Sequence, residues 1–496
     1  MLPDEVLLAI FDFHVVAALW RSHVMPTRDG TDTIHTRGNL ITKKGIEAWL
    51  SLTHVCRRWR NIVFGSPCRL NLHLACTPRT RAIDTLDIWP HLCLLIQGSM
   101  SSVSSVDNII AVLGHGNRIC TIKLWELASW QLGKVSEAMQ KPFPGMSNLQ
   151  LRTSDKSAPV VPDSFLGGSA PYLRHLELER IPFPGLPKLL LSAIHLVTLR
   201  LHNIPHSGYF SPEAMSTCLS VLSSLKEICL EFESPLSRPD WESRRPPTPT
   251  RVVLPALTYF GFKGVSEYLG DLVALIDAPR LNYLYIVFFN QIDFDTPQLA
   301  QFISRTPRLK APHEAHVVFD NPTVLVELLS RTSAFGYGDL NVKISCRELD
   351  WQLSSLAQVC TSSLPPLSTA ESLYIEHPHS QLDWKNNVEN TQWLEFLLPF
   401  VAVRSLHVSG EFAPGIVSAL QGLVGGGVTE VLPTLGSIFL GEPHRSGPVQ
   451  EAIGKFTAVR QLSGHPIAIS EWYESSRRYE NGKSIVRNKF SPYLSH

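Results

Sequence analysis

A short apolar pattern recurs along most of this 496-residue chain and restricts the folds that it can adopt. Each copy reads apolar-x-x-apolar-x-apolar, and neighbouring copies are mostly about 23 to 33 residues apart. Complete copies begin at Ile119, Leu173, Leu196, Leu225, Leu257, Leu281, Val403 and Leu435, and shorter or imperfect ones at Leu149, Leu340 and Leu373. A period of this length predicts a stack of similar units that share one apolar interior.

Each unit is expected to supply one short strand and one helix. The helix-like stretches 212–222, 265–276, 297–304 and 390–398 lie between copies of the pattern. A lone unit would leave the apolar faces of its strand and helix in water, so the units must stack. The predicted fold class is α/β: a solenoid with a parallel sheet on one face and helices on the other.

This pattern resembles the leucine-rich-repeat solenoids. Regular members of that family carry Asn or Cys three residues after the last apolar position of the strand. Here that position is occupied by Ile181, Ile204, Val265 and Phe289. We therefore expect irregular repeats without an Asn ladder, and a break near 306–312, where Pro312 replaces an apolar residue.

Alternation along the strands predicts which side chains point away from the helices. Five aromatic residues at such positions are candidate target-binding residues: Trp125, Tyr259, Tyr283, Tyr285 and Tyr374. Exposed aromatic side chains on a rigid face are common anchors of protein–protein interfaces. The same reasoning places Lys123, Glu177, Glu179, Arg200, His202, Lys263, Glu376, His407 and Phe439 on this face. The alternative is a face that neighbouring loops cover.

Two amphipathic helices are predicted before the repeats. Pro3, Asp4 and Glu5 suit the start of the first helix, whose stripe would contain Val6, Leu7, Ile10 and Phe11. The second helix would span 49–64 and stop at Gly65. Its apolar stripe would contain Leu52, Val55, Cys56, Trp59, Ile62 and Val63. A polar loop, 23–44, is predicted between the two helices. Such a pair is too small to be stable alone, so it must rest on the repeats, on a partner protein, or on both.

These residues carry a second resemblance. Leu2-Pro3-Asp4-Glu5-Val6-Leu7, followed by Val55-Cys56-Arg57-Arg58-Trp59, resembles the F-box motif, and the whole chain is similar to the expanded F-box families of mushroom-forming fungi. The resemblance implies a helical hairpin that docks on the Skp-type adaptor of a cullin-based ubiquitin ligase. The residues implied to form the adaptor-facing or hairpin-core surface are Leu2, Pro3, Val6, Leu7, Ile10, Val55, Cys56 and Trp59.

The two halves of the motif are farther apart than is usual in that family, because a longer polar insertion occupies about 17–48. The expected organisation is an F-box-like domain at 1–68, a solenoid at 69–465, and a C-terminal cap and tail at 466–496.

Charge and composition exclude several classes of function. Lys and Arg together number 44, as do Asp and Glu, so no general field would attract nucleic acid or a membrane surface. The longest apolar run, 283–289, is far shorter than the roughly 20 residues that span a bilayer. The nine cysteines include no C-x-x-C pair and are interpreted as buried, reduced thiols. An intracellular location, cytoplasmic or nuclear, is expected.

No pattern of catalytic residues is recognised. The chain has no G-x-S-x-G, P-loop, H-E-x-x-H or dinucleotide-binding sequence, so no catalytic residue and no cofactor are expected. His313 with His316, and His377 with His379, lack further clustered ligands, so surface or loop histidines are favoured over a metal site. The sequence thus favours a substrate-recognition subunit of a ubiquitin ligase with an unidentified target. The alternative is an interaction scaffold whose N-terminal helices only cap the repeats.

Overall fold

The computed structural model describes most of the chain. The described residues are 2–24, 47–66, 70, 72–78, 86, 92–101, 106–236, 251–291, 294, 296–320, 322–331, 339–346, 348–377, 388–423, 427, 429–441, 448–472, 478–480 and 483–485. Most of the predicted polar loop and most of the predicted C-terminal tail lie outside these residues. The chain divides into two compact units, Met1–Leu199 and Arg200–His496.

Three helices begin the first unit: α1 (Asp4–Val24), α3 (Leu50–Thr53) and α4 (Arg57–Gly65). The first starts directly after Pro3, as predicted, and the last ends at Gly65, also as predicted. However, α1 extends to Val24, so the start of the predicted polar insertion is helical. The predicted helix over 49–64 is also wrong as a single element, because it is interrupted between His54 and Cys56.

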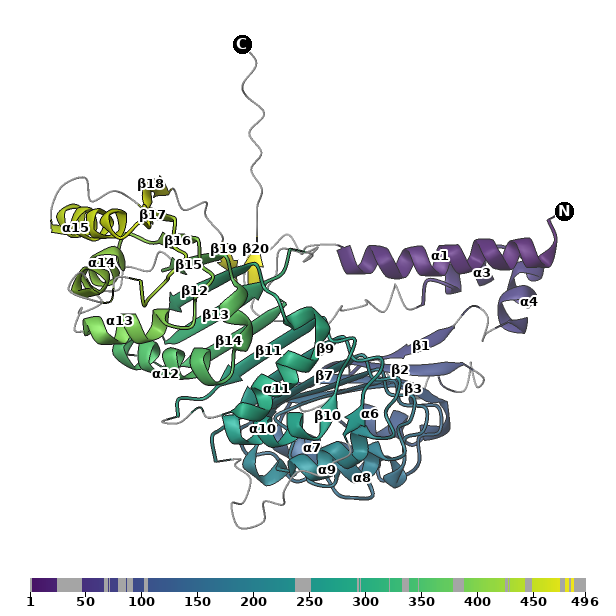
Figure 1. Cartoon of the computed structure of the whole chain (residues 1–496). Helices are drawn as coiled ribbons and strands as arrows, with labels where there is room; N and C mark the ends of the chain where they lie inside the picture. Colours follow the sequence, from purple (N-terminus) through teal and green to yellow (C-terminus); the bar gives the residue numbers. More distant parts are fainter. Residues whose placement is uncertain are drawn as a thin grey trace. The chain divides into compact units, whose positions relative to one another are not determined.

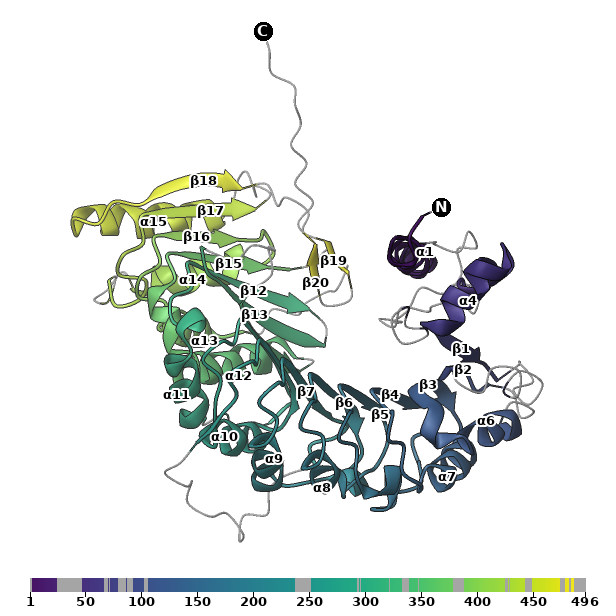
Figure 2. The same cartoon turned by 90° about the vertical axis from the view of Figure 1, so that its right-hand side faces the viewer.

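The strands of the first unit lie in the order β1 (His73–Cys76), β2 (Cys93–Ser99), β3 (Ile119–Leu127), β4 (Asn148–Thr153) and β5 (His175–Glu179). All four strand pairs are parallel. The helices between them are α6 (Val106–Leu113), α7 (Ser129–Ala138) and α8 (Leu186–Leu190), with short 3-10 turns η2 (Gly116–Arg118) and η3 (Phe165–Gly168). In Figure 2 these α-helices lie on one side of the strands. β6 (Thr198–Ile204) contains the division between the units.

The second unit continues the same alternation of strands and helices. Its first elements are η4 (His206–Gly208), α9 (Pro212–Leu219), β7 (Glu227–Phe232), β9 (Tyr259–Gly264), α10 (Ser266–Ala274), β11 (Tyr283–Phe288), α11 (Pro297–Arg305) and η6 (Pro307–Leu309). β8 (Val252–Val253) and β10 (Ile276–Asp277) form a separate parallel pair. Three of the helices fall in stretches where helices were predicted.

The later elements are β12 (Glu314–Asp320), β13 (Thr323–Leu329), β14 (Leu340–Ser345), α12 (Leu349–Ser362), η7 (Pro365–Thr369), β15 (Ser372–Glu376), α13 (Asn390–Leu397), β16 (Ser405–Val408), α14 (Ala413–Gly422), β17 (Ser437–Gly441), α15 (Pro448–Leu462) and β18 (Ala468–Trp472). A small hairpin, β19 (Arg478–Glu480) and β20 (Lys483–Ile485), follows. Figure 1 shows α12 to α15 on one side of the neighbouring strands.

One strand of this sheet runs against the others. The order is β7-β9-β11-β14-β13-β12-β15-β16-β17-β18, and β13 is antiparallel to both of its neighbours. β14 lies parallel to β11, and β12 lies parallel to β15. The regular stacking is therefore interrupted soon after the predicted break at 306–312. The prediction that all strands are parallel is wrong at β13.

The apolar pattern forms the interior of each unit. Leu173, Leu199 and Leu284 are fully buried, and the other complete copies are buried in the same way except at Leu440, which is half-buried. The α/β solenoid of strands and helices predicted from the sequence is therefore confirmed.

The repeats were predicted to lack an Asn ladder, and buried glutamine side chains supply hydrogen bonds between some of their strands and helices. The Gln131 amide donates to the Met100 carbonyl (2.8 Å) and accepts from the Ala128 N–H (2.9 Å). The Gln352 amide donates to the carbonyls of Cys346 (2.6 Å) and Asp320 (3.1 Å). Because an unpaired buried backbone group is costly, these amides stabilise the bends between the strands and their helices.

The expectation of buried thiols holds for most described cysteines. Cys76, Cys218, Cys229, Cys346 and Cys360 are buried, and Cys120 is half-buried. Cys56 and Cys93 are exposed, which contradicts the prediction for these two. Among the described helices, none has both the length and the hydropathy that crossing a bilayer requires.

Candidate protein-binding surfaces

The first surface is an apolar face of α1 that no described part of the chain covers. Leu7, Leu8, Phe11 and Val15 turn inward and are buried. The opposite side of the helix presents Val6, Ile10 and Phe13, and Leu2 lies just before the helix; the exposed fractions of Leu2, Val6, Ile10 and Phe13 are 52, 42, 47 and 75%. The prediction that Val6, Leu7, Ile10 and Phe11 share one stripe is therefore wrong, because Val6 and Ile10 face outward. We call Leu2, Val6, Ile10 and Phe13 the outer α1 face.

The packing between α1 and α4 fixes the orientation of this face. The Phe11 ring lies against the half-buried Trp59 ring, with 4.7 Å between their centroids. Arg58 donates to the Asp4 carboxylate (2.5 Å) and to the Leu2 carbonyl (2.6 Å), so α4 also holds the start of α1. Pro3 lies exposed just before the helix.

Cys56 and Val55 lie in the break before α4. The Cys56 sulfur accepts a hydrogen bond from the Trp59 N–H (3.4 Å) and so caps the helix. Both residues are exposed, Val55 by 58%. They were predicted to lie on the buried stripe of a continuous helix, and the break removes them from it.

The segment just before α3 contacts the first strand of the sheet. The Trp49 indole N–H donates to the His73 carbonyl (3.0 Å), and the Glu47 carboxylate accepts from the Ala75 N–H (3.2 Å). Among the described strands, β1 pairs with β2 on one edge. The contacts from Trp49 and Glu47 therefore fall on the opposite edge of β1. Covering an edge in this way protects it from pairing with another chain.

In each unit a second surface is the strand face opposite the helices, and the predicted aromatic residues on it lie half-buried: Trp125 in the first unit, and Tyr259, Tyr283, Tyr285 and Tyr374 in the second. Tyr259 and Tyr283 occupy paired positions on β9 and β11, and their rings stack with 5.2 Å between centroids. The Tyr283 hydroxyl accepts a hydrogen bond from Asn341 on β14 (2.9 Å). Tyr285 pairs in register with Gly261, and burial raises the pKa of its phenol to about 12.

Four rings form a continuous stack across the later strands. His316, Tyr374, His407 and Phe439 lie on β12, β15, β16 and β17 at paired positions. The centroid distances along the row are 4.2, 4.2 and 4.3 Å, with interplanar angles of 4, 15 and 4°. We call these four residues the ring row. The predicted target-binding residue Tyr374 lies in its middle.

Two carboxylates flank the first ring of this row. The His316 ring is 1% exposed, and its nitrogens lie 3.3 Å from a Glu314 oxygen and 3.6 Å from a Glu376 oxygen. Glu376 was expected to be exposed, but it is buried because it lies beside this imidazole. Burial, with the nearby charge of His316, lowers the pKa of His407 to about 4.

Charged side chains on this face are mostly paired with each other. In the first unit, Arg152 lies 2.5 Å from Glu177 and 3.6 Å from Glu179. The predicted target-binding residue Trp125 is half-buried on β3 of the same unit. In the second unit, Arg200 binds Glu227 through two nitrogens, at 2.8 and 3.0 Å.

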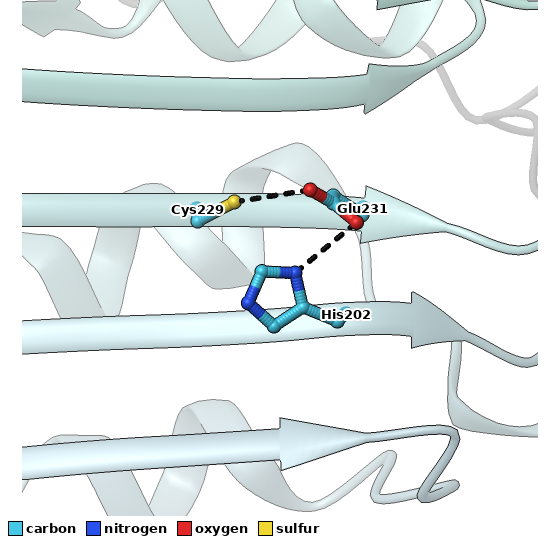
Figure 3. Close-up of side chains that lie close together, drawn as sticks. All are labelled: His202, Cys229 and Glu231. Carbon is cyan, nitrogen blue, oxygen red and sulfur yellow. Dashed lines mark hydrogen bonds and ion pairs between the residues drawn. The ribbon is translucent and has the colours of Figure 1, made fainter. Parts of the chain in front are cut away.

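A group of three possible metal ligands lies next to the Arg200–Glu227 pair. His202 on β6 and Cys229 and Glu231 on β7 place a nitrogen, a sulfur and a carboxylate oxygen within 4.8 Å of one another. Figure 3 shows the Glu231 carboxylate joined by dashed lines to both the Cys229 sulfur and the His202 ring. It lies 3.1 Å from the His202 Nδ1 and 3.5 Å from the Cys229 sulfur.

Burial and neighbouring charges shift the pKa values of Cys229 and Glu231 in opposite directions. Burial, together with the Glu231 carboxylate, raises the pKa of the Cys229 thiol well above its usual range. Partial burial of Glu231 would raise its pKa, but the hydrogen bond and charge of His202 outweigh burial, and the pKa lies below its usual value. The sequence analysis placed His202 on this face but did not connect it with Cys229 and Glu231. Cys229 and Glu231 directly follow the buried positions Ile228 and Leu230 of the repeat after the one that contains His202. Aligning these two repeats would have placed the three side chains together.

Several solved structures are similar to part of this chain. One of them is the leucine-rich repeat-containing protein LegL7 from Legionella pneumophila, with 13% sequence identity and a TM-score of 0.26. The similarity covers 78% of this chain and 98% of that one. No protein-family model and no curated protein matches the chain.

Proposed function

We propose that this chain is a non-catalytic receptor subunit of a cullin-based ubiquitin ligase. In this proposal the outer α1 face binds the Skp-type adaptor, and the strand face of the repeats binds a target protein. The target would be brought to the transfer site by proximity, with no side chain of this chain taking part in the chemistry. The chain would act in the cytoplasm or the nucleus.

The observation that carries the proposal is the outer α1 face. Three large apolar side chains on α1, and Leu2 just before it, are exposed to water, although the opposite side of the same helix packs against its neighbours. Burying apolar surface yields roughly 25 cal/mol per Å², so such a face favours association with another apolar surface. Three of its four residues, Leu2, Val6 and Ile10, are among those that the resemblance to the F-box motif implies for the adaptor-facing or hairpin-core surface.

A binding measurement with matched variants tests this proposal. Ile10 is 47% exposed, so Ile10→Asp should leave the fold intact while placing a charge in the proposed interface. We expect the full chain to retain a purified Skp-type adaptor in a pull-down, and Ile10→Asp to lose at least about 90% of it. The matched control is Ile194→Asp, because Ile194 is 48% exposed and lies outside the outer α1 face.

Equal retention by both variants would contradict the proposed interface. Leu7 and Trp59 are poor choices for this test. Leu7 is buried and Trp59 packs on Phe11, so changing either would disturb the helices themselves.

A second candidate function is a scaffold outside any ubiquitin ligase, whose N-terminal segment only covers the first strand. The contacts from Trp49 and Glu47 to β1 favour it. It predicts that the wild-type chain retains no adaptor, whereas Trp49→Ala lowers the melting temperature. Under the receptor proposal the same chain retains adaptor, and Ile10→Asp removes binding without lowering the melting temperature.

A further inference from the structure

We propose that His202, Cys229 and Glu231 bind a zinc ion on the strand face of the second unit. The three side chains offer one imidazole nitrogen, one sulfur and one carboxylate oxygen, the donor types by which proteins hold zinc. This site is independent of adaptor binding.

The spacing of the donors suits a tetrahedral ion. Bonds of about 2.0–2.3 Å from zinc to N, O and S place neighbouring ligand atoms of a tetrahedron about 3.4–3.6 Å apart. The Glu231 carboxylate lies close to both other donors through different oxygens: Oε2 is 3.1 Å from the His202 nitrogen and Oε1 is 3.5 Å from the Cys229 sulfur. One nitrogen, one sulfur and one carboxylate oxygen lie within 4.8 Å of one another, so binding an ion would require these three atoms to move closer together, with a single Glu231 oxygen as the ligand.

The charges also balance. Binding would replace the proton of the Cys229 thiol with a sulfur–metal bond, and the proton would pass to water. A thiolate and the Glu231 carboxylate would then neutralise the two charges of the ion, and His202 would bind as the neutral imidazole, with any proton that it carries also passing to water. The nearby cations are engaged elsewhere, because Arg200 pairs with Glu227 and the Lys263 ammonium lies over the Phe289 ring (5.7 Å).

Room beside the sulfur comes from a glycine. Gly261 on β9 pairs with Cys229, and a Cβ added there would lie 3.0 Å from the sulfur and 3.3 Å from the Tyr259 hydroxyl. The side chains of His202 and Glu231 are 25 and 27% exposed, so an ion can reach them from solvent. Three protein ligands would leave a fourth position for water or for a side chain of the target.

Cobalt substitution provides the test, because a thiolate bound to Co²⁺ gives a charge-transfer absorption that imidazole and carboxylate ligands do not give. The full chain is freed of metal with a chelator and titrated with Co²⁺, and then with Zn²⁺ as competitor. We expect the thiolate band to saturate at one equivalent of Co²⁺ and to disappear when Zn²⁺ is added. Absence of the band in the wild-type chain would overturn the proposal and leave a hydrogen-bonded cluster only.

Variants assign the band to this site. Cys229→Ser preserves the size of the buried side chain and should abolish the band, whereas Cys93→Ser, which removes an exposed thiol elsewhere, should leave it unchanged. His202→Gln changes a partly exposed residue and keeps the thiol, so it should retain a weaker band with at least about tenfold lower affinity. A band that survives in Cys229→Ser, or disappears in Cys93→Ser, would overturn the assignment, and circular dichroism checks that each variant is folded.

Discussion

The rings of Tyr374 and His407 lie almost parallel, with an interplanar angle of 15° and 4.2 Å between their centroids. The two residues come from different repeats, but they hold the same position on neighbouring parallel strands. Strands about 4.8 Å apart and in register place equivalent side chains directly over each other. The ring row is thus a consequence of the repeat, and it forms wherever successive repeats carry a ring at that outward position.

The first prediction concerns His407 and pH. Its pKa falls from 6.5 to about 4 on folding, because burial and the charge of His316 outweigh the attraction of Glu314 and Glu376. Between these two values the unfolded chain binds more protons than the folded one, so this residue makes the protein less stable as the pH falls from about 6.5 to about 4. Above about pH 6.5 it has no such effect.

His407→Phe keeps a ring in the row and removes the titrating group. Urea unfolding at about pH 7.5 and about pH 4.5 should show a smaller loss of stability in this variant than in the wild type. Equal losses in the two proteins would contradict the lowered pKa, whatever the absolute stability of the variant.

A second prediction concerns Arg460 on α15. Its buried guanidinium donates to the carbonyls of Leu432, Pro433 and Leu435 at 3.2–3.3 Å. Arg460→Ala would leave these carbonyls without that donor and should lower the free energy of unfolding by about 2–4 kcal/mol. Lys455→Ala on the same helix is the control, since Lys455 forms an exposed pair with Glu451 and should be replaceable without a measurable change.

A third prediction tests the buried glutamines. Gln131→Leu keeps the approximate volume but removes the hydrogen bonds to Met100 and Ala128, so it should cost about 2–3 kcal/mol in denaturant unfolding. Gln140→Leu, at an exposed position near the end of the same helix, should have little effect. Similar costs for both variants would mean that the buried amide does not replace the Asn ladder.

A fourth prediction concerns thiol reactivity. A hydrogen bond from Cys120 lowers the pKa of Cys93 to about 6; burial opposes this, and the Arg118 charge supports it. At about pH 7 Cys93 should therefore be mostly thiolate and react with iodoacetamide several-fold faster than Cys56, the other exposed thiol among the described cysteines. Peptide mapping by mass spectrometry measures both rates, and Cys120→Ala, which removes the hydrogen-bond donor, should slow the reaction at Cys93. Equal rates at Cys93 and Cys56 would be the contrary result.

The sequence predicted the repeats well because burial of one strand face imposes a strict alternation. Leu173, Leu199 and Leu284 hold that alternation and are buried. The reversed strand β13 was not predicted, because the residues of β12 and β13 are apolar without the repeat pattern. A signal was present: Asp320 pairs with Thr323, and the Asn-Pro dipeptide between them is typical of a turn.

The orientation of α1 could not be read from its sequence in the same way. Apolar residues occur on nearly all sides of its first three turns, so periodicity alone does not separate Val6 and Ile10 from Leu7 and Phe11. The inward side is set by contacts with α4, such as that between Phe11 and Trp59, which join residues far apart in the chain. The same limit applies to the His202, Cys229 and Glu231 group, which forms only when two repeats lie side by side.

Direct titration of the purified full chain with a purified Skp-type adaptor tests the central claim, that the outer α1 face binds this class of protein. Isothermal titration calorimetry should show a saturable complex with one adaptor per chain, and a heat-capacity change that indicates burial of apolar surface. A chain that is folded by circular dichroism but gives no binding heat at several temperatures, and elutes separately from the adaptor in size-exclusion chromatography, would contradict the claim.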